Sequence, residues 1–108
     1  MSNVSEKDWK IFKKIREEAL EAFCQGCLNE FKEIIDETKE SAHNRYLLNY
    51  RIVQNRDKQM SLFFDNLSRS KASLQLMALR GEGLANESLV SELSEELRAK
   101  TDPQNTKW

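Results

Sequence analysis

The clearest arrangement of reactive side chains is the segment CQGC, in which Cys24 and Cys27 are three residues apart. Thiol pairs of this spacing carry redox chemistry at the start of a helix, where free backbone N–H groups lower the thiol pKa. Here the apolar periodicity places the pair deep inside a long helix, so this activation is absent. Zinc needs four ligands, and only His43 is able to join the two thiols within one chain. We expect packed thiols, with a metal or redox protein as an alternative function.

A second pattern with metal-binding chemistry is the Glu-x-x-His spacing of Glu40 and His43. In di-iron carboxylate bundles this spacing directs both side chains inward, but a second motif and two further glutamates complete the site. The pattern falls at the corner of a predicted hairpin, where ligands point toward water. With a single histidine in the chain, no catalytic triad or acid–base pair can be assembled. We therefore expect no enzymatic activity and no cofactor.

The elements that must position these residues are predicted to be helices. The 108 residues are 39% hydrophobic and 32% charged, with three glycines and one proline. Folds rich in sheets or loops need more glycine and proline for their turns. A compact sphere also needs a larger apolar share than long, thin helices with much surface. The composition predicts an all-α fold with a single domain.

Apolar residues at steps of three and four predict helices over about 5–40, 43–80 and 87–100. The first two form a long antiparallel hairpin that turns near residue 41, and the third is a short C-terminal helix. We expect one helical domain over 1–100 and a flexible tail over 101–108. The hairpin brings an acidic segment beside a basic one, namely Glu30, Glu33, Asp36, Glu37 and Glu40 beside Arg45, Arg51, Arg56 and Lys58.

The second predicted helix carries a heptad seam that includes two charges. Asp57 and Lys71 lie seven positions on either side of Phe64. In an antiparallel pair of these helices with Phe64 at the dyad, Asp57 of one chain would face Lys71 of the other. Charges within a seam cost stability but fix its register. We predict a coiled-coil, four-helix-bundle-like homodimer of two hairpins, with self-association residues Asp57, Met60, Phe64, Leu67 and Lys71.

The charge distribution supports another alternative, which is binding of nucleic acid. Residues 43–80 carry 7 basic and 2 acidic side chains, between two acidic flanks. Against this reading, the acidic third helix would be repelled by a phosphate backbone. The net charge of -1 favours neutralisation between segments of the folded chain. The predicted phosphate contacts of this alternative are Arg45, Arg51, Arg56 and Lys58.

The segment WKIFKKI, from Trp9 to Ile15, resembles the start of cecropin-type antimicrobial peptides, which implies action on membranes. The resemblance ends at Ile15, because Glu17, Glu18 and Glu21 follow and the apolar stripe continues as in a bundle helix. No apolar run approaches the roughly 20 residues of a membrane span, and the polar start lacks the apolar part of a signal peptide. We expect a cytoplasmic protein without membrane insertion and with reduced cysteines.

These patterns favour a function class and leave the partner open. We expect a non-enzymatic helical protein that acts as a scaffold or adaptor. Its contacts with another macromolecule would be made through helix faces, and its own dimer through the seam of the second helix.

Overall fold

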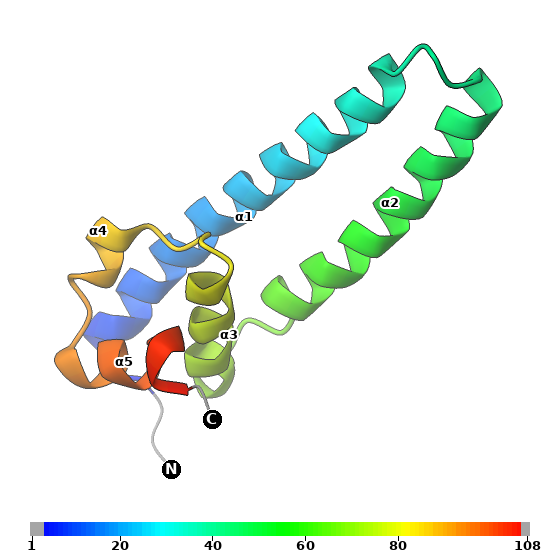
Figure 1. Ribbon diagram of the computed structural model, residues 1–108. Coiled ribbons are helices and arrows are strands. Elements are labelled where there is room, and N and C mark those ends of the chain that lie inside the picture. The colour runs from blue at the N-terminus through cyan, green and yellow to red at the C-terminus, as the bar shows by residue number, and fades with distance from the viewer. Residues whose placement is uncertain (1–3, 107–108) are drawn as a thin grey trace.

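The computed structural model describes residues 4–106, and every regular element in that range is a helix (Figure 1). The prediction of an all-α fold is therefore confirmed. The elements in chain order are α1 (Glu6–Asp36), α2 (Ala42–Phe64), α3 (Arg69–Gly81), α4 (Glu87–Val90), α5 (Glu95–Lys100) and a 3-10 helix η1 (Pro103–Thr106).

The two longest helices, α1 and α2, form the predicted antiparallel hairpin (Figure 1). Ser5 caps α1 by accepting a hydrogen bond from Asp8 N at 3.1 Å, and Ser41 caps α2 by accepting one from Asn44 N at 3.1 Å. Such hydroxyls satisfy N–H groups that have no partner inside the helix. The first helix ends at Asp36, somewhat before the predicted end at 40, and it runs through Gly26 without a break.

The prediction of one helix over 43–80 is wrong, because the chain turns between α2 and α3. Asp65 and Ser68 have extended backbones, and Asn66 lies in the left-handed region with φ 60. Asparagine enters that region more readily than most residues, and Asp, Asn and Ser favour turns. After this turn α3 packs against the N-terminal half of α1 (Figure 1).

α2 and α3 bury residues in the same core, but across the turn these residues do not follow the regular spacing that predicted one helix. Phe63 and Phe64 enter the core from the end of α2, and Ala72 and Leu76 enter it from α3. Leu67 and Lys71, which continue the predicted spacing from Phe64, are exposed. Steps of three and four across this turn therefore identify neither a continuous helix nor the buried side chains.

α3 ends with a Schellman motif in which Gly83 takes the left-handed conformation. Gly83 has φ 73, its N–H donates to Arg80 O at 3.1 Å, and Leu84 N donates to Leu79 O at 2.9 Å. Both bonds satisfy carbonyls that lack a partner at the helix end. α3 thus ends at Gly81, one residue beyond the predicted end at 80, and the left-handed residue is Gly83.

The predicted third helix over 87–100 is interrupted, since residues 91–94 form a turn between α4 and α5. The backbone N–H and the hydroxyl of Ser94 donate to the buried carboxylate of Asp8, at 2.9 and 2.6 Å. This contact fastens the first turn of α1 to the start of α5. Asn86 caps α4, at the place where the sequence indicated a helix start.

The first residues of the predicted tail over 101–108 belong to the packed part of the molecule. Thr101 is fully buried, and its hydroxyl accepts a hydrogen bond from Arg80 Nη1 at 2.9 Å. Beyond it, Pro103–Thr106 forms η1 in contact with α3. The last two residues of the predicted tail lie outside the described range.

The hydrophobic core lies at one end of the molecule, which we call the head (residues 4–22 and 61–106). We call the rest of the hairpin, residues 23–60, the arm; it projects away from the head in Figure 1. The radius of gyration is 16.9 Å, against about 13 Å for a compact domain of this length. The largest fully buried side chains all lie in the head, and they are Phe12, Ile15, Leu76, Leu79 and Thr101.

Candidate functional site

The arm is two helices thick and leaves most of its apolar side chains in solvent. Cys27 is its one buried residue, and the buried residues of α2, Phe63 and Phe64, belong to the head. Two helices without a third layer bury one strip of each and leave the other sides open. The arm is therefore the part of the described chain with the largest uncovered apolar surface.

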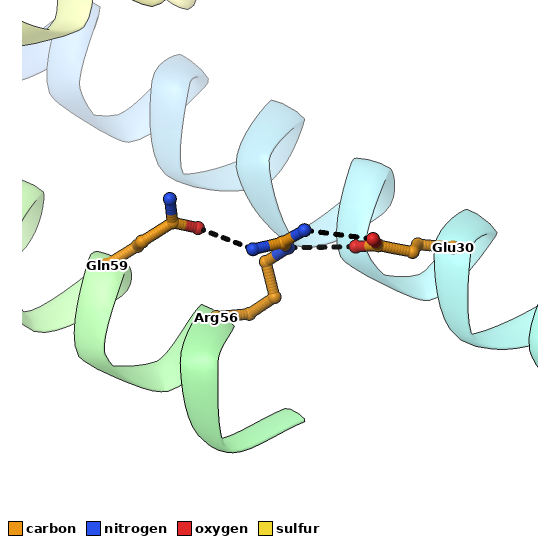
Figure 2. A network of polar contacts seen from close by, with 3 residues as sticks. All are labelled: Glu30, Arg56 and Gln59. Atoms are coloured by element: carbon orange, nitrogen blue, oxygen red, sulfur yellow. Dashed lines mark hydrogen bonds and ion pairs between the residues drawn. The ribbon is translucent and has the colours of Figure 1, made fainter. Parts of the chain in front are cut away.

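An ion pair joins the two helices of the arm near its middle (Figure 2). Arg56 donates from Nε and Nη2 to the two carboxylate oxygens of Glu30 at 2.8 and 2.9 Å, and from Nη1 to Gln59 Oε1 at 3.1 Å. This two-point contact fixes the geometry as well as neutralising charge. The hydrogen bond from Arg56 lowers the pKa of the Glu30 carboxyl. The predicted approach of acidic α1 to basic α2 is confirmed by this pair.

A second arginine closes the tip of the arm. Arg45 Nη1 donates to the carbonyl oxygen of Ile35, and Nε donates to the carbonyl oxygen of Glu40 at 3.2 Å. The last carbonyls of a helix have no partner within it, so this arginine completes the end of α1 and the turn. Its charge is thus used to hold the hairpin closed.

One side of the arm is hollowed into a groove of about 670 Å³, which we call the acidic groove. Carboxylates from α1 and the turn stand on one wall, and leucines, isoleucine and arginines from α2 stand on the other. Opposite charges across the groove neutralise one another, as the near-zero net charge indicated. The lining residues are Glu30, Glu33, Ile34, Glu37, Glu40, Asn44, Arg45, Leu47, Leu48, Arg51 and Ile52.

Other sides of the same two helices carry large apolar side chains in solvent. Leu28 of α1 is 59% exposed, and Tyr46 and Tyr50 of α2 are 71% and 57% exposed. Ile35 and Val53 are also exposed. At about 100° per residue, Leu28 and Ile35 share one side of α1, and the other three share one side of α2. We call these five residues the apolar face.

The apolar face lies on the side of the arm opposite the acidic groove. Glu33 and Leu48 line the groove, and each lies roughly 150° around its helix from the apolar residues of that helix. Because the groove fixes which sides of α1 and α2 lie together, the two apolar sides also lie together. A continuous exposed surface of this kind is typical of a protein interface.

Two of the four predicted nucleic-acid contacts are engaged within the chain, and the other two are free within the described part of it. Arg45 and Arg56 are engaged with groups of their own chain, at the tip and in the ion pair. The side chains of Arg51 and Lys58 are exposed and make no hydrogen bond or ion pair within residues 4–106. The four cations therefore do not form one free basic surface, although binding of nucleic acid itself stays a prediction.

The predicted metal or redox residues are not brought together. Cys24 and Cys27 lie within α1, whereas His43 lies at the start of α2, beyond the turn. Burial raises the pKa of the Cys27 thiol, which favours the less reactive protonated form. Within the described range, no group of three or more His, Cys, Asp or Glu side chains is placed to hold a metal ion.

The predicted self-association residues do not form a seam, because the turn after α2 separates them. Phe64 is buried, with its ring centroid 5.9 Å from that of Phe23, so it is occupied within its own chain. Met60 packs partly against the core, and Asp57 and Lys71 are exposed on different helices. The register that paired Asp57 with Lys71 through one continuous helix is therefore wrong. Leu67, in the turn, is also exposed.

None of the five residues of the apolar face was among the predicted contact residues, including Leu28 and Ile35 of α1. Both lie beside the long stripe of α1 that predicted the helix, so they were not grouped with it. Their seven-residue spacing, which places them two turns apart on one side, was the available signal.

Comparison of the chain with known family models, curated proteins and solved structures gave no match. Among the described residues, no helix is both long and apolar enough to cross a bilayer. The class defined by fold and surface is an all-helical protein with a packed head and a two-helix arm.

Proposed function

We propose that this protein is a non-enzymatic helical interaction protein that pairs with a second copy of itself through the apolar face of the arm. The observation that carries the proposal is the exposure of five large apolar side chains on one side of a two-helix layer. Two such layers packed face to face make a four-helix bundle, which would remove these side chains from water.

The size of the arm suits a dimer interface. The arm part of α2 is about 28 Å long at 1.5 Å per residue, and two adjacent helices are about 20 Å wide. The product of this length and width is roughly 600 Å². The solvent-accessible area of the same side is larger because side chains protrude from it, and it is close to the roughly 800 Å² per partner of a standard interface.

The spacing of residues along α2 favours an antiparallel register about a dyad between Tyr50 and Val53. Tyr50 of one copy then packs on Val53 of the other, and Tyr46 lies opposite Asp57. A tyrosine hydroxyl donates well to a carboxylate, so Asp57 is satisfied without a lysine. The same register places the tip of each arm next to the head of the other copy, because residue 42 lies opposite residue 61. The dimer would present two heads at opposite ends, as a scaffold or adaptor requires.

The experiment is a measurement of molar mass against concentration by sedimentation equilibrium. We expect the unmodified chain to form a dimer with a dissociation constant on the order of micromolar, as for interfaces of modest area. Tyr50→Glu places a charge at the centre of the interface, and we expect it to remain a monomer at about 100 times that concentration.

The matched control is Asn55→Glu, an exposed change on α2 away from the apolar face. It adds the same charge to the same helix and should leave the dimer intact. Circular dichroism checks that both variants keep their helical content. A monomer at every concentration, or equal effects of the two changes, would falsify the proposal.

A further inference from the structure

A second concave surface lies where α2 turns into α3. A cavity of about 670 Å³ opens there, and we call it the elbow groove. Side chains from the head hold the turn in place: Arg16 Nη2 donates to Phe64 O at 2.7 Å, and Gln75 Nε2 donates to Asp65 O at 2.7 Å. The groove is therefore formed before anything binds, which lowers the cost of ordering it.

The walls of the elbow groove carry the most exposed leucines of the described chain. Leu62, from α2, is 75% exposed, and Leu74, from α3, is 69% exposed. Both line the groove, although they belong to different helices. Apolar side chains on two facing walls are suited to an apolar ridge inserted between them.

The charges at the elbow groove are mainly positive and uncompensated. Lys58 and Lys71 line it, and neither side-chain ammonium group makes a hydrogen bond or ion pair to any residue in 4–106. The one carboxylate in the lining, Asp65, accepts a hydrogen bond from the Ser61 hydroxyl. Two free ammonium groups beside an apolar strip favour a ligand with carboxylates next to apolar side chains.

A buried acceptor in the lining is also unsatisfied. Gln75 is only 7% exposed, and its Oε1 has no hydrogen-bond donor while its Nε2 is bound to the turn. Buried amide oxygens are ordinarily paired, and those without a partner occur at sites that await a ligand or water. Gln75 lies in the lining of the groove, so its unpaired oxygen is close to the site of the proposed occupant.

We propose that the elbow groove binds an acidic amphipathic helix of another protein. Its apolar side chains pack between Leu62 and Leu74, and its carboxylates lie near Lys58 and Lys71. This inference rests on the proposed function as an interaction protein and adds a partner class to it. It uses a different surface from the dimer, because the elbow groove surrounds the turn after α2 and none of its lining residues belongs to the apolar face.

The alternatives fit the groove less well. A phosphate backbone gains nothing from two exposed leucines, which an amphipathic helix would cover. A bilayer is penetrated by protruding apolar surfaces, whereas this surface is concave. An extended peptide needs a free strand edge to pair with, and residues 4–106 contain no strand.

The experiment uses the full chain and two fluorescent helical peptides of about 18 residues, with leucines at i, i+3, i+4 and i+7. One peptide carries glutamates beside the leucines, and the other carries lysines. We expect fluorescence anisotropy to show the acidic peptide binding at least about tenfold more tightly, with an affinity that falls as salt rises. Vesicles of neutral and anionic lipid are titrated in parallel.

Two double variants locate the site. Leu62→Ser with Leu74→Ser should weaken the acidic peptide at least about tenfold, and both positions are exposed, so the fold is kept. Lys58→Glu with Lys71→Glu should reverse the preference between the two peptides. The matched control, Lys10→Glu with Lys14→Glu, changes the same charges on exposed positions of α1 and should alter binding less than about twofold.

Equal affinity for both peptides, no binding of either, or retention of binding by the leucine variant would overturn the inference. Binding to vesicles that is lost in the leucine variant, without binding of the acidic peptide, would also overturn it in favour of a bilayer. The same titration with Tyr50→Glu separates the two proposals. The variant is expected to be a monomer that still binds the acidic peptide. An unmodified chain that stays a monomer but binds the acidic peptide contradicts the dimer alone, and an unmodified chain that dimerises but binds neither peptide contradicts the elbow groove alone.

Discussion

α1 runs through both the head and the arm, and its apolar residues are buried in the head but largely exposed in the arm. In the head, Phe12 and Ile15 are fully buried, because α3 and the C-terminal helices pack around that half of α1. In the arm, Leu28 and Ile35 are more than half exposed, because only α2 lies beside them. Burial of an apolar side chain thus depends on how many helices surround it, and the arm lacks a third layer. That deficit is what a second copy would supply.

The largest expected effect tests whether stability comes from the head. Phe12→Ala removes a fully buried ring and should lower the free energy of unfolding by about 3–5 kcal/mol, through lost burial and the cavity left behind. Tyr46→Ala removes an aromatic ring of the arm and should cost less than about 0.5 kcal/mol in the monomer. Urea unfolding at low protein concentration measures both. Similar losses for the two variants would contradict the division into head and arm.

A smaller effect concerns the ion pair that holds the arm together. Glu30 and Arg56 are about one-third exposed, so solvent screens them, and a double-mutant cycle with Glu30→Gln and Arg56→Gln should give a coupling of about 0.5–1 kcal/mol. The pKa of Glu30 is lowered on folding, so this coupling is present above the ordinary value of 4.5 and is lost as the pH falls through the lowered folded value.

The control for the ion pair is Glu33→Gln, in the same groove, whose side chain makes no hydrogen bond or ion pair within residues 4–106. We expect little change in the free energy of unfolding for this variant at any pH between 3 and 8. A coupling between Glu30 and Arg56 that stayed constant across that pH range would argue against the pair.

The smallest expected effect has the opposite sign and tests how loosely the arm is packed. A Cβ at Gly26 would meet no atom within 4 Å, so Gly26→Ala should raise the free energy of unfolding by about 0.5–1 kcal/mol through the higher helix propensity of alanine. Gly83→Ala is the control and should be destabilising, because Gly83 has φ 73. Urea unfolding compares the two. Destabilisation by Gly26→Ala would reveal a close neighbour there.

Local signals in the sequence were sufficient for the starts of α1, α2 and α4 and for the hairpin, whereas the starts of α3 and α5 were missed. Ser5, Ser41 and Asn86 cap helices where a hydroxyl or amide precedes an apolar repeat. The opposed charges of the two hairpin helices indicated their approach, and Glu30 with Arg56 confirms it. These predictions are correct because each depends on neighbouring residues in the sequence or on the sign of the net charge of a segment.

The turn after Phe64 and the exposed surfaces were not predicted, and both failures have one cause. Periodicity identifies the side of a helix that is apolar, but it does not tell whether a turn intervenes or which chain covers that side. Asp65, Asn66 and Ser68 were a turn signal that the regular spacing concealed. Leu62 and Leu74 were indistinguishable in type from the buried Leu76.

The amino-acid sequence alone determined that the chain is helical, that its two long helices fold back on each other, and where those helices begin. These properties follow from side-chain spacing and from capping residues, which act over three or four positions. Only the tertiary structure decided that α3 returns to the first half of α1 and leaves the arm two helices thick. The physical reason is that the hydrophobic effect has no preferred direction, so apolar side chains are stabilised by burial against any neighbour. The turn at Asn66 sets the direction of α3 and therefore determines which apolar side chains are buried.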